Sequence, residues 1–254
     1  MFQDTENEIH FILTHNENVC KKLFRMQQLY LDDHGNYSKD LRGKIEKGLE
    51  TVIHKFTLST IHLEFLWKQS EASRTEIVFD FTNSVSEHKW NDARRTLGSL
   101  FLESFLFQIK SFLDVYQKYC CLIVGIEKPN YNGLEGFYKI LTKVQPNFRG
   151  TADKVSDYFK NQIFADNQWG KLLKDLRDKI AHFDYVRYSY QGTEIIQDTL
   201  LNWPTLKGMT YDRFCQDVEN NVFEMITNVS PMLYGLEWKS GAYDKDAWSR
   251  KSDR

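Results

Sequence analysis

The chain has 254 residues, of which 41% are hydrophobic and 27% charged, with 4 prolines, 13 glycines and a net charge of −2. This balance excludes a disordered or collagen-like chain and indicates a folded protein of one large or two small domains. Because acidic and basic residues nearly cancel, the chain as a whole has no excess charge to attract nucleic acid, and any phosphate-binding surface must be a local patch.

The four cysteines, Cys20, Cys120, Cys121 and Cys215, form no C-x-x-C pair, and two of them are adjacent in an apolar stretch. We therefore expect reduced, buried thiols. The acidic residues 1–6 lack the basic and apolar regions of a signal peptide. The longest charge-free apolar run, residues 119–126, is shorter than the roughly 20 residues that cross a bilayer. These features predict a cytoplasmic protein without a membrane-spanning helix.

The first 89 residues carry two periodic apolar segments. Spacings of mostly three and four over residues 9–29 predict one helix or two short ones. A second segment begins after Ser38, its expected N-cap, and runs to about residue 69 as one helix or two joined near residues 57–60. Residues 70–89 are predicted to form a loop, because polar residues surround their short apolar run. We expect residues 1–89 to form a helical segment packed on the core.

The stretch from residue 90 to residue 125 is the most apolar of the chain, and its apolar residues cover most of a helical wheel. Such a helix is buried by neighbours on several sides. Four polar residues nevertheless share one narrow face at spacings of seven, four and three: Glu103, Lys110, Asp114 and Gln117. This stripe faces either solvent or a site.

Residues 129–133 and 146–150 break the periodicity. They separate a short helix at residues 134–144 from one at residues 151–163, which Thr151 is expected to cap. The next helix, with Asp166 or Asn167 as its N-cap, carries apolar residues at helical spacing from Trp169 to Phe183.

Residues 186–201 alternate in a way that predicts a small β-hairpin with its turn at Gln191 and Gly192. A last helix is expected over about residues 210–234. Residues 236–254 are predicted to be a loosely held polar tail.

An unusual group of side chains occupies the last two turns of the helix that begins near Trp169. Asp178 and His182 are four residues apart, so the carboxylate can accept a hydrogen bond from the imidazole and fix its tautomer. Arg177 lies five residues before His182, about 140° around the helix, and its long side chain can reach back toward the same edge. A cation, a general acid or base and an orienting carboxylate suit phosphodiester chemistry.

The run from Arg177 to His182 has the form Arg, polar residue, three more residues, His. In this it resembles the HEPN superfamily of small all-α domains, many of which are metal-independent endoribonucleases. The resemblance covers roughly residues 90–235, including the apolar helix around residues 107–114. It implies a mainly α fold, a HEPN-like up-and-down helical bundle at residues 90–235, with an N-terminal helical extension and a small β-hairpin after the motif helix.

The resemblance also implies a function. RNA would be cleaved by attack of its 2′-hydroxyl, with His182 as general acid or base, Arg177 on the phosphate and Asp178 orienting the histidine. Two copies of the motif would meet in a homodimer to form one composite cleft, without metal or other cofactor. An antitoxin or regulatory protein is a candidate partner. In some related toxins a tyrosine two residues after the histidine is modified by the antitoxin, whereas here Asp184 has that place and Tyr185 follows.

Four further residues are candidates for substrate binding: Tyr185, Arg187, Lys110 and Asp114. The first two belong to a run of aromatic and cationic residues that suits RNA stacking, although packing of the hairpin is the commoner cause of such a run. The other two belong to the polar stripe at residues 103–117, which is either solvated or part of the cleft. Histidines and cysteines show no metal-ligand spacing, so we expect no metal.

In an alternative interpretation, the same residues have a structural role and catalyse no reaction. Arg177, Asp178 and His182 then form a surface network near a helix C-terminus, where a cationic histidine is favoured by the helix dipole. The protein is in that case a non-catalytic dimerisation module, or a module that binds RNA or a nucleotide without cutting it.

Overall fold

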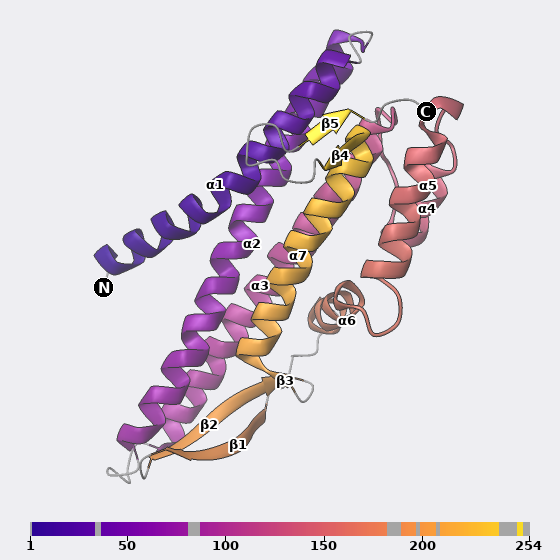
Figure 1. Cartoon of the computed structure of the whole chain (residues 1–254). Coiled ribbons are helices and arrows are strands. Elements are labelled where there is room, and N and C mark those ends of the chain that lie inside the picture. Colours follow the sequence, from indigo (N-terminus) through magenta and orange to yellow (C-terminus); the bar gives the residue numbers. More distant parts are fainter. Residues whose placement is uncertain are drawn as a thin grey trace. The chain divides into compact units, whose positions relative to one another are not determined.

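The computed structural model describes residues 2–33, 37–80, 87–181, 189–196, 199–206, 209–238 and 248–250, with side chains at 16–17, 19–33, 37–68, 99–181, 209–210 and 213–236. Helices make up most of it (Figure 1), which confirms the prediction of a mainly α protein. None of the described helices is both long enough and apolar enough to cross a bilayer.

Most of the described chain is helical. They are α1 (Phe2–Asp33), α2 (Lys39–Asp80), α3 (Glu87–Ile123), α4 (Gly133–Leu141), α5 (Arg149–Tyr158), α6 (Trp169–Ala181) and α7 (Tyr211–Tyr234), with the 3₁₀ turn η1 (Pro146–Phe148) before α5 and the π-helical turn η2 (Phe159–Ile163) after it. Strands β1 (Ser189–Ile196), β2 (Thr199–Leu206) and β3 (Met209–Thr210) form one antiparallel sheet, and β4 (Leu236–Trp238) pairs with β5 (Trp248–Arg250).

The chain divides into two compact units, each assembled from separate stretches. Unit 1 contains Met1–Thr57, Ser111–Gln168 and Phe223–Arg254, and unit 2 contains Leu58–Lys110 and Trp169–Val222. Helices α2, α3 and α7 are therefore each divided between the two units. The limits of the units do not coincide with the boundaries predicted after residues 89 and 235, which remain a prediction.

Unit 1 is built around rings and hydroxyls contributed by four helices. Phe56 of α2 packs against Phe112 of α3 and Phe223 of α7, with ring centroids 5.7 and 5.6 Å away. Gln27 of α1 donates one hydrogen bond to the carbonyl of Ile45 at 3.0 Å and one to the Tyr119 hydroxyl at 2.9 Å. The Tyr119 hydroxyl is in turn 2.6 Å from that of Tyr234.

The C-terminal end of α3 shows how local sequence sets a boundary in unit 1. Gly125 has a φ of +83°, and the amides of Gly125 and Ile126 return to the carbonyls of Leu122 and Cys121 at 3.0 and 2.9 Å. This is the Schellman arrangement, which glycine adopts without a steric penalty. The carbonyl of Ile123, left without a helical partner, accepts a hydrogen bond from the Tyr30 hydroxyl at 2.9 Å. The helix therefore ends where the predicted apolar stretch ends.

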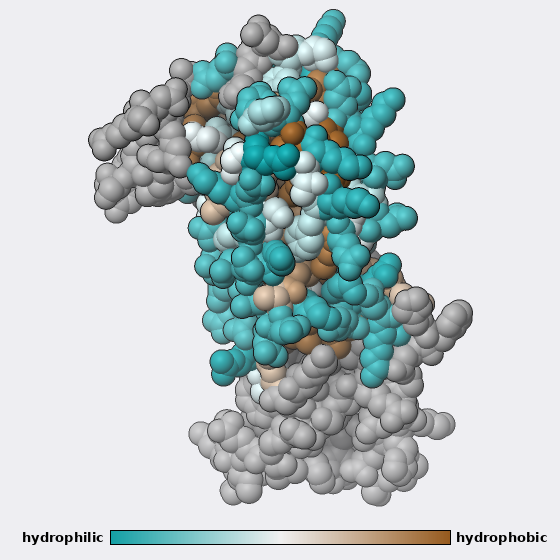
Figure 2. Space-filling model, turned by 90° about the vertical axis from the view of Figure 1, so that its right-hand side faces the viewer, coloured by the Kyte–Doolittle hydropathy of each residue, from teal (hydrophilic) through white to brown (hydrophobic). Residues whose placement is uncertain are grey.

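Unit 2 packs the second part of α2 and the first part of α7 against the first part of α3. The rings of Phe65 and Phe101 stack at 6.1 Å, and Phe105 meets Phe214 edge to face at the same centroid distance. On the surface shown in Figure 2, hydrophilic residues prevail in the described part, and hydrophobic ones appear between them. The helices thus turn their apolar faces inward, as the sequence periodicity predicts.

Several predicted helix starts can be compared with the structure. Ser38 is the N-cap of α2, since its hydroxyl accepts a hydrogen bond from the amide of Leu41 at 3.2 Å, which confirms the prediction. The caps predicted at Thr151 and at Asp166 or Asn167 are wrong, because α5 begins at Arg149 and α6 only at Trp169.

The prediction that residues 70–89 form a loop is wrong for most of the segment. Helix α2 continues to Asp80 and α3 begins at Glu87, so most of the segment is helical. The segment from residue 70 to residue 76 contains one alanine, one arginine, one threonine, two serines and two glutamates, and the alanine, arginine and glutamates favour helix without adding an apolar stripe.

The predicted hairpin exists, but its turn lies elsewhere. Strands β1 and β2 pair from Ser189 with Thr205 to Ile196 with Thr199, so the connection is residues 197–198 rather than Gln191 and Gly192. The register shifts between Gln191 and Thr193, so Gly192 is the extra residue of a bulge. The predicted polar tail also needs correction, because β4 and β5 pair within it.

Candidate functional site

Helix α6 carries the described part of the predicted motif. Its buried side chains are Trp169, Leu173 and Leu176, which recur at spacings of four and three and fix the rotation of the helix against the rest of unit 2. Arg177 follows directly, one turn after Leu173, and Asp178 lies one turn after Lys174. Both motif residues are half-buried, so they stand at the border between the core and solvent.

The Arg177 guanidinium is held by two groups. Its Cζ atom lies 5.6 Å from the centre of the Phe107 ring on α3, within the range of a cation–π contact. Its Nη1 atom donates a hydrogen bond to Oδ1 of Asp178 at 3.2 Å. Its Nε atom, by contrast, is buried and has no hydrogen-bond partner among the described residues.

The contacts of Arg177 can be compared with the usual cost of a buried donor that has no acceptor. A cation–π contact at a part-exposed site contributes about 0.5–1 kcal/mol. A buried N–H without an acceptor costs about 1–3 kcal/mol. The Nε donor of Arg177 has no acceptor among the described residues, so it can donate a hydrogen bond to a further partner.

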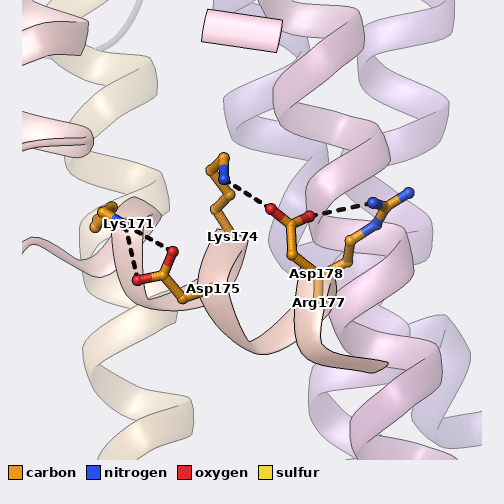
Figure 3. A network of polar contacts seen from close by, with 5 residues as sticks. All are labelled: Lys171, Lys174, Asp175, Arg177 and Asp178. Carbon is orange, nitrogen blue, oxygen red and sulfur yellow. Dashed lines mark hydrogen bonds and ion pairs between the residues drawn. The ribbon is translucent and has the colours of Figure 1, made fainter. Parts of the chain in front are cut away.

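Asp178 receives a charged hydrogen bond on each oxygen. Oδ2 accepts from Nζ of Lys174 at 2.7 Å and Oδ1 from Arg177, and Figure 3 shows the two donors approaching from opposite sides. Burial acts to raise the pKa of Asp178, but the hydrogen bonds from Lys174 and Arg177 outweigh it, and the pKa lies below its ordinary value. The carboxylate is therefore ionised at neutral pH.

A second lysine–aspartate pair with the same spacing lies one turn earlier on α6. Nζ of Lys171 donates to both oxygens of Asp175, at 2.7 and 2.9 Å, as Figure 3 also shows. This pair does not include an arginine. It provides a matched control for the pair of Lys174 and Asp178.

Three predicted site residues lie outside the described part of the chain: His182, Tyr185 and Arg187. The hydrogen bond expected between Asp178 and His182 therefore stays a prediction. Each oxygen of Asp178 has a second lone pair, so its two existing bonds leave it able to accept another.

Of the two predicted residues on α3, only one belongs to the same unit as Arg177. Lys110 lies one turn after Phe107 in unit 2 and is half-buried, whereas Asp114 lies in unit 1. The stripe they belong to is not uniformly solvated, because Gln117 is only 2% exposed, whereas Glu103, Lys110 and Asp114 are half-buried.

Sequence reasoning missed two contributors to the site. Lys174 could have been found, because it is four residues before Asp178 on a predicted helix. Phe107 gave no such signal, because its contact with Arg177 joins residues 70 positions apart on different helices.

The cysteines and the possible metal ligands of the described residues can be compared with what thiol and metal chemistry require. Cys120, Cys121 and Cys215 are buried free thiols, as predicted, whereas Cys20 is only half-buried. Burial raises the pKa of Cys121 to about 12, so its thiolate is scarce at neutral pH. In the described part of the chain, no three histidine, cysteine or acidic side chains gather in a way that suits a metal ion.

Comparison with known proteins does not assign the chain to a group. No protein-family model, no curated protein and no solved structure is significantly similar to it.

Proposed function

We propose that this protein is a metal-independent endoribonuclease of the HEPN type. The observation that carries the proposal is Arg177, a permanently charged side chain with an unpartnered buried Nε among the described residues, held between Phe107 and Asp178. A guanidinium forks onto phosphate oxygens and stabilises the charge that develops on them without help from a metal.

In the proposed reaction, His182 removes the proton from a ribose 2′-hydroxyl as that oxygen attacks the adjacent phosphorus atom. The bond to the 5′-oxygen of the next nucleotide breaks, and a protonated histidine supplies the proton to that leaving oxygen. Arg177 stabilises the pentacoordinate phosphate, and Asp178 orients the imidazole. The products are a 2′,3′-cyclic phosphate and a free 5′-hydroxyl.

The proposed enzyme is a homodimer in the cytoplasm, in which two copies of the motif form one RNA-binding cleft. An antitoxin or another regulatory protein would control it. Tyr185, Arg187 and Lys110 are proposed to contact the RNA strand.

The test is cleavage of a labelled single-stranded RNA by the purified chain in excess EDTA. We expect products that end in a 2′,3′-cyclic phosphate. His182→Ala should lower the rate by about 10²–10⁴-fold and Arg177→Ala by about 10²-fold. Lys171→Ala, on the same helix, should cut at the wild-type rate. Undiminished cleavage by His182→Ala would contradict the mechanism.

A second candidate function is favoured by two exposed apolar side chains on one side of α3. Leu100 is 55% and Phe107 42% exposed, and residues seven apart lie on the same side of a helix. Such a face suits a non-catalytic dimerisation module. If Arg177→Ala dissociates the dimer and neither variant nor wild type cuts RNA, the module is supported; if cleavage alone is lost, the enzyme is supported.

A further inference from the structure

Phe107 is an exception within the buried part of α3. Its neighbours Phe105, Leu106 and Ile109 are almost completely buried, whereas its own ring is 42% exposed. At a position this exposed, packing alone requires an aromatic side chain less than it does in the core. The contact that does depend on an aromatic ring is the one with Arg177.

The guanidinium needs two restraints to keep a fixed orientation, because it is a plane at the end of a long, flexible side chain. Oδ1 of Asp178 fixes the position of Nη1 along one edge. The ring of Phe107, 5.6 Å from Cζ, restrains the group as a whole through its negative face. The Nε donor remains unused among the described residues.

We propose that Phe107 is a positioning residue for Arg177, and that its aromatic ring, rather than its size, holds the guanidinium ready for the phosphate. This inference rests on the proposed ribonuclease function. Pre-positioning of a charged group lowers the barrier because no reorganisation is needed when the transition state forms. Loss of the ring should therefore reduce kcat more than it changes KM.

The test compares Phe107→Leu, which keeps an apolar side chain but removes the ring, with Phe107→Tyr, which keeps the ring. Phe24→Leu is the matched control, since Phe24 is 40% exposed on α1 in the other unit. The first readout is the NMR order parameter of the Arg177 Nε–H group, assigned by its disappearance in Arg177→Lys. The second readout is kcat and KM for RNA cleavage.

We expect Phe107→Leu to lower the order parameter and to reduce kcat by about twofold to fivefold, the factor expected for one cation–π contact. Phe107→Tyr should restore both, and Phe24→Leu should change neither. Wild-type values of both quantities in Phe107→Leu would overturn the inference.

The two readouts separate this inference from the proposed function. If the wild type cuts no RNA but the Arg177 signal still depends on the ring, the ribonuclease is wrong and the positioning of Arg177 is supported. If the wild type cuts RNA and neither the signal nor kcat depends on the ring, the positioning role is wrong and the ribonuclease stands.

Discussion

The two compact units use polar side chains in different ways. In unit 1 the polar network is neutral and buried, and it joins Gln27, Tyr119 and Tyr234 across three helices. In unit 2 the network on α6 is charged and half-exposed, with Lys174 and Arg177 on either side of Asp178. A neutral network in the core specifies packing, whereas exposed ion pairs contribute little to stability.

The comparison predicts where stability and function can be separated. Substitutions in the buried rings and hydroxyls of unit 1 should lower the free energy of unfolding. Substitutions in the α6 network should leave it nearly unchanged and alter the chemistry instead. Among the buried atoms without a partner in the described residues, Arg177 Nε is the one that belongs to a permanently charged group, which is consistent with this division.

The largest expected effect is that of Phe56→Ala in unit 1. The side chain is 1% exposed and packs against two other rings, so its removal leaves a cavity. We expect the free energy of unfolding to fall by about 3–5 kcal/mol, measured by urea denaturation. Phe24→Ala, at an exposed position, should cost far less. Equal losses in the two variants would contradict the assignment of the unit 1 core.

A smaller loss is expected for Tyr119→Phe, because the substitution removes only a hydroxyl. Gln27 would keep its bond to the Ile45 carbonyl, but the buried Tyr234 hydroxyl would lose its partner. We expect a loss of about 1–3 kcal/mol in the same measurement.

Tyr116→Phe is the matched control for Tyr119→Phe. The Tyr116 hydroxyl contacts that of Ser230 at 2.9 Å, and a serine in a helix can turn its hydroxyl to the carbonyl four residues earlier. The cost should therefore be about 0.5–1.5 kcal/mol. A larger loss for Tyr116→Phe than for Tyr119→Phe would contradict the proposed importance of the Tyr119 network.

The elements that the sequence predicted well are those set by local signals. The Ser38 cap and the span of α7 follow from residues within one or two turns of each boundary. The predictions at residues 70–89 and at Gly192 were wrong because the same local residues are compatible with two structures. A glycine serves a turn or a bulge equally well, and strand pairing with distant residues decides between them.

The candidate site was predictable only in part, for the same reason. The spacing of Arg177 and Asp178 on α6 follows from helix periodicity, and so does the pairing of Asp178 with Lys174. The contact between the Phe107 ring and Arg177 does not follow from helix periodicity, because it depends on tertiary packing between α3 and α6. The neutral network of unit 1 could not be predicted from the sequence either, since Gln27 and Tyr119 are 92 residues apart.

The function of the α6 network is tested by Asp178→Asn. The substitution keeps the size of the side chain but removes the charge that Arg177 and Lys174 contact. Because the pairs are part-exposed, we expect a stability loss of no more than about 1 kcal/mol, but a fall in RNA cleavage of at least about tenfold. Asp175→Asn, in the matched pair with Lys171, should match the stability effect without the loss of cleavage. Equal cleavage by both variants would remove Asp178 from the mechanism.

The smallest effect concerns acid stability. The pKa of Asp178 is lower in the folded protein than its ordinary value, which is near 4. Its ion pairs therefore stabilise the fold above about pH 4, and this contribution is lost as the pH falls through the folded-state pKa. For a half-exposed pair the contribution is about 0.3–0.5 kcal/mol.

Lys174→Met should raise the pKa of Asp178 toward its ordinary value, because it removes the shorter of the two hydrogen bonds, at 2.7 against 3.2 Å. The carboxyl resonance, followed by NMR as the pH is lowered, measures this shift, and Lys171→Met on the same helix should leave it unchanged. If Lys174→Met does not move the titration, Arg177 alone holds the carboxylate ionised. In that case Arg177 and Asp178 would form a closed pair, and Asp178 would be less able to orient His182.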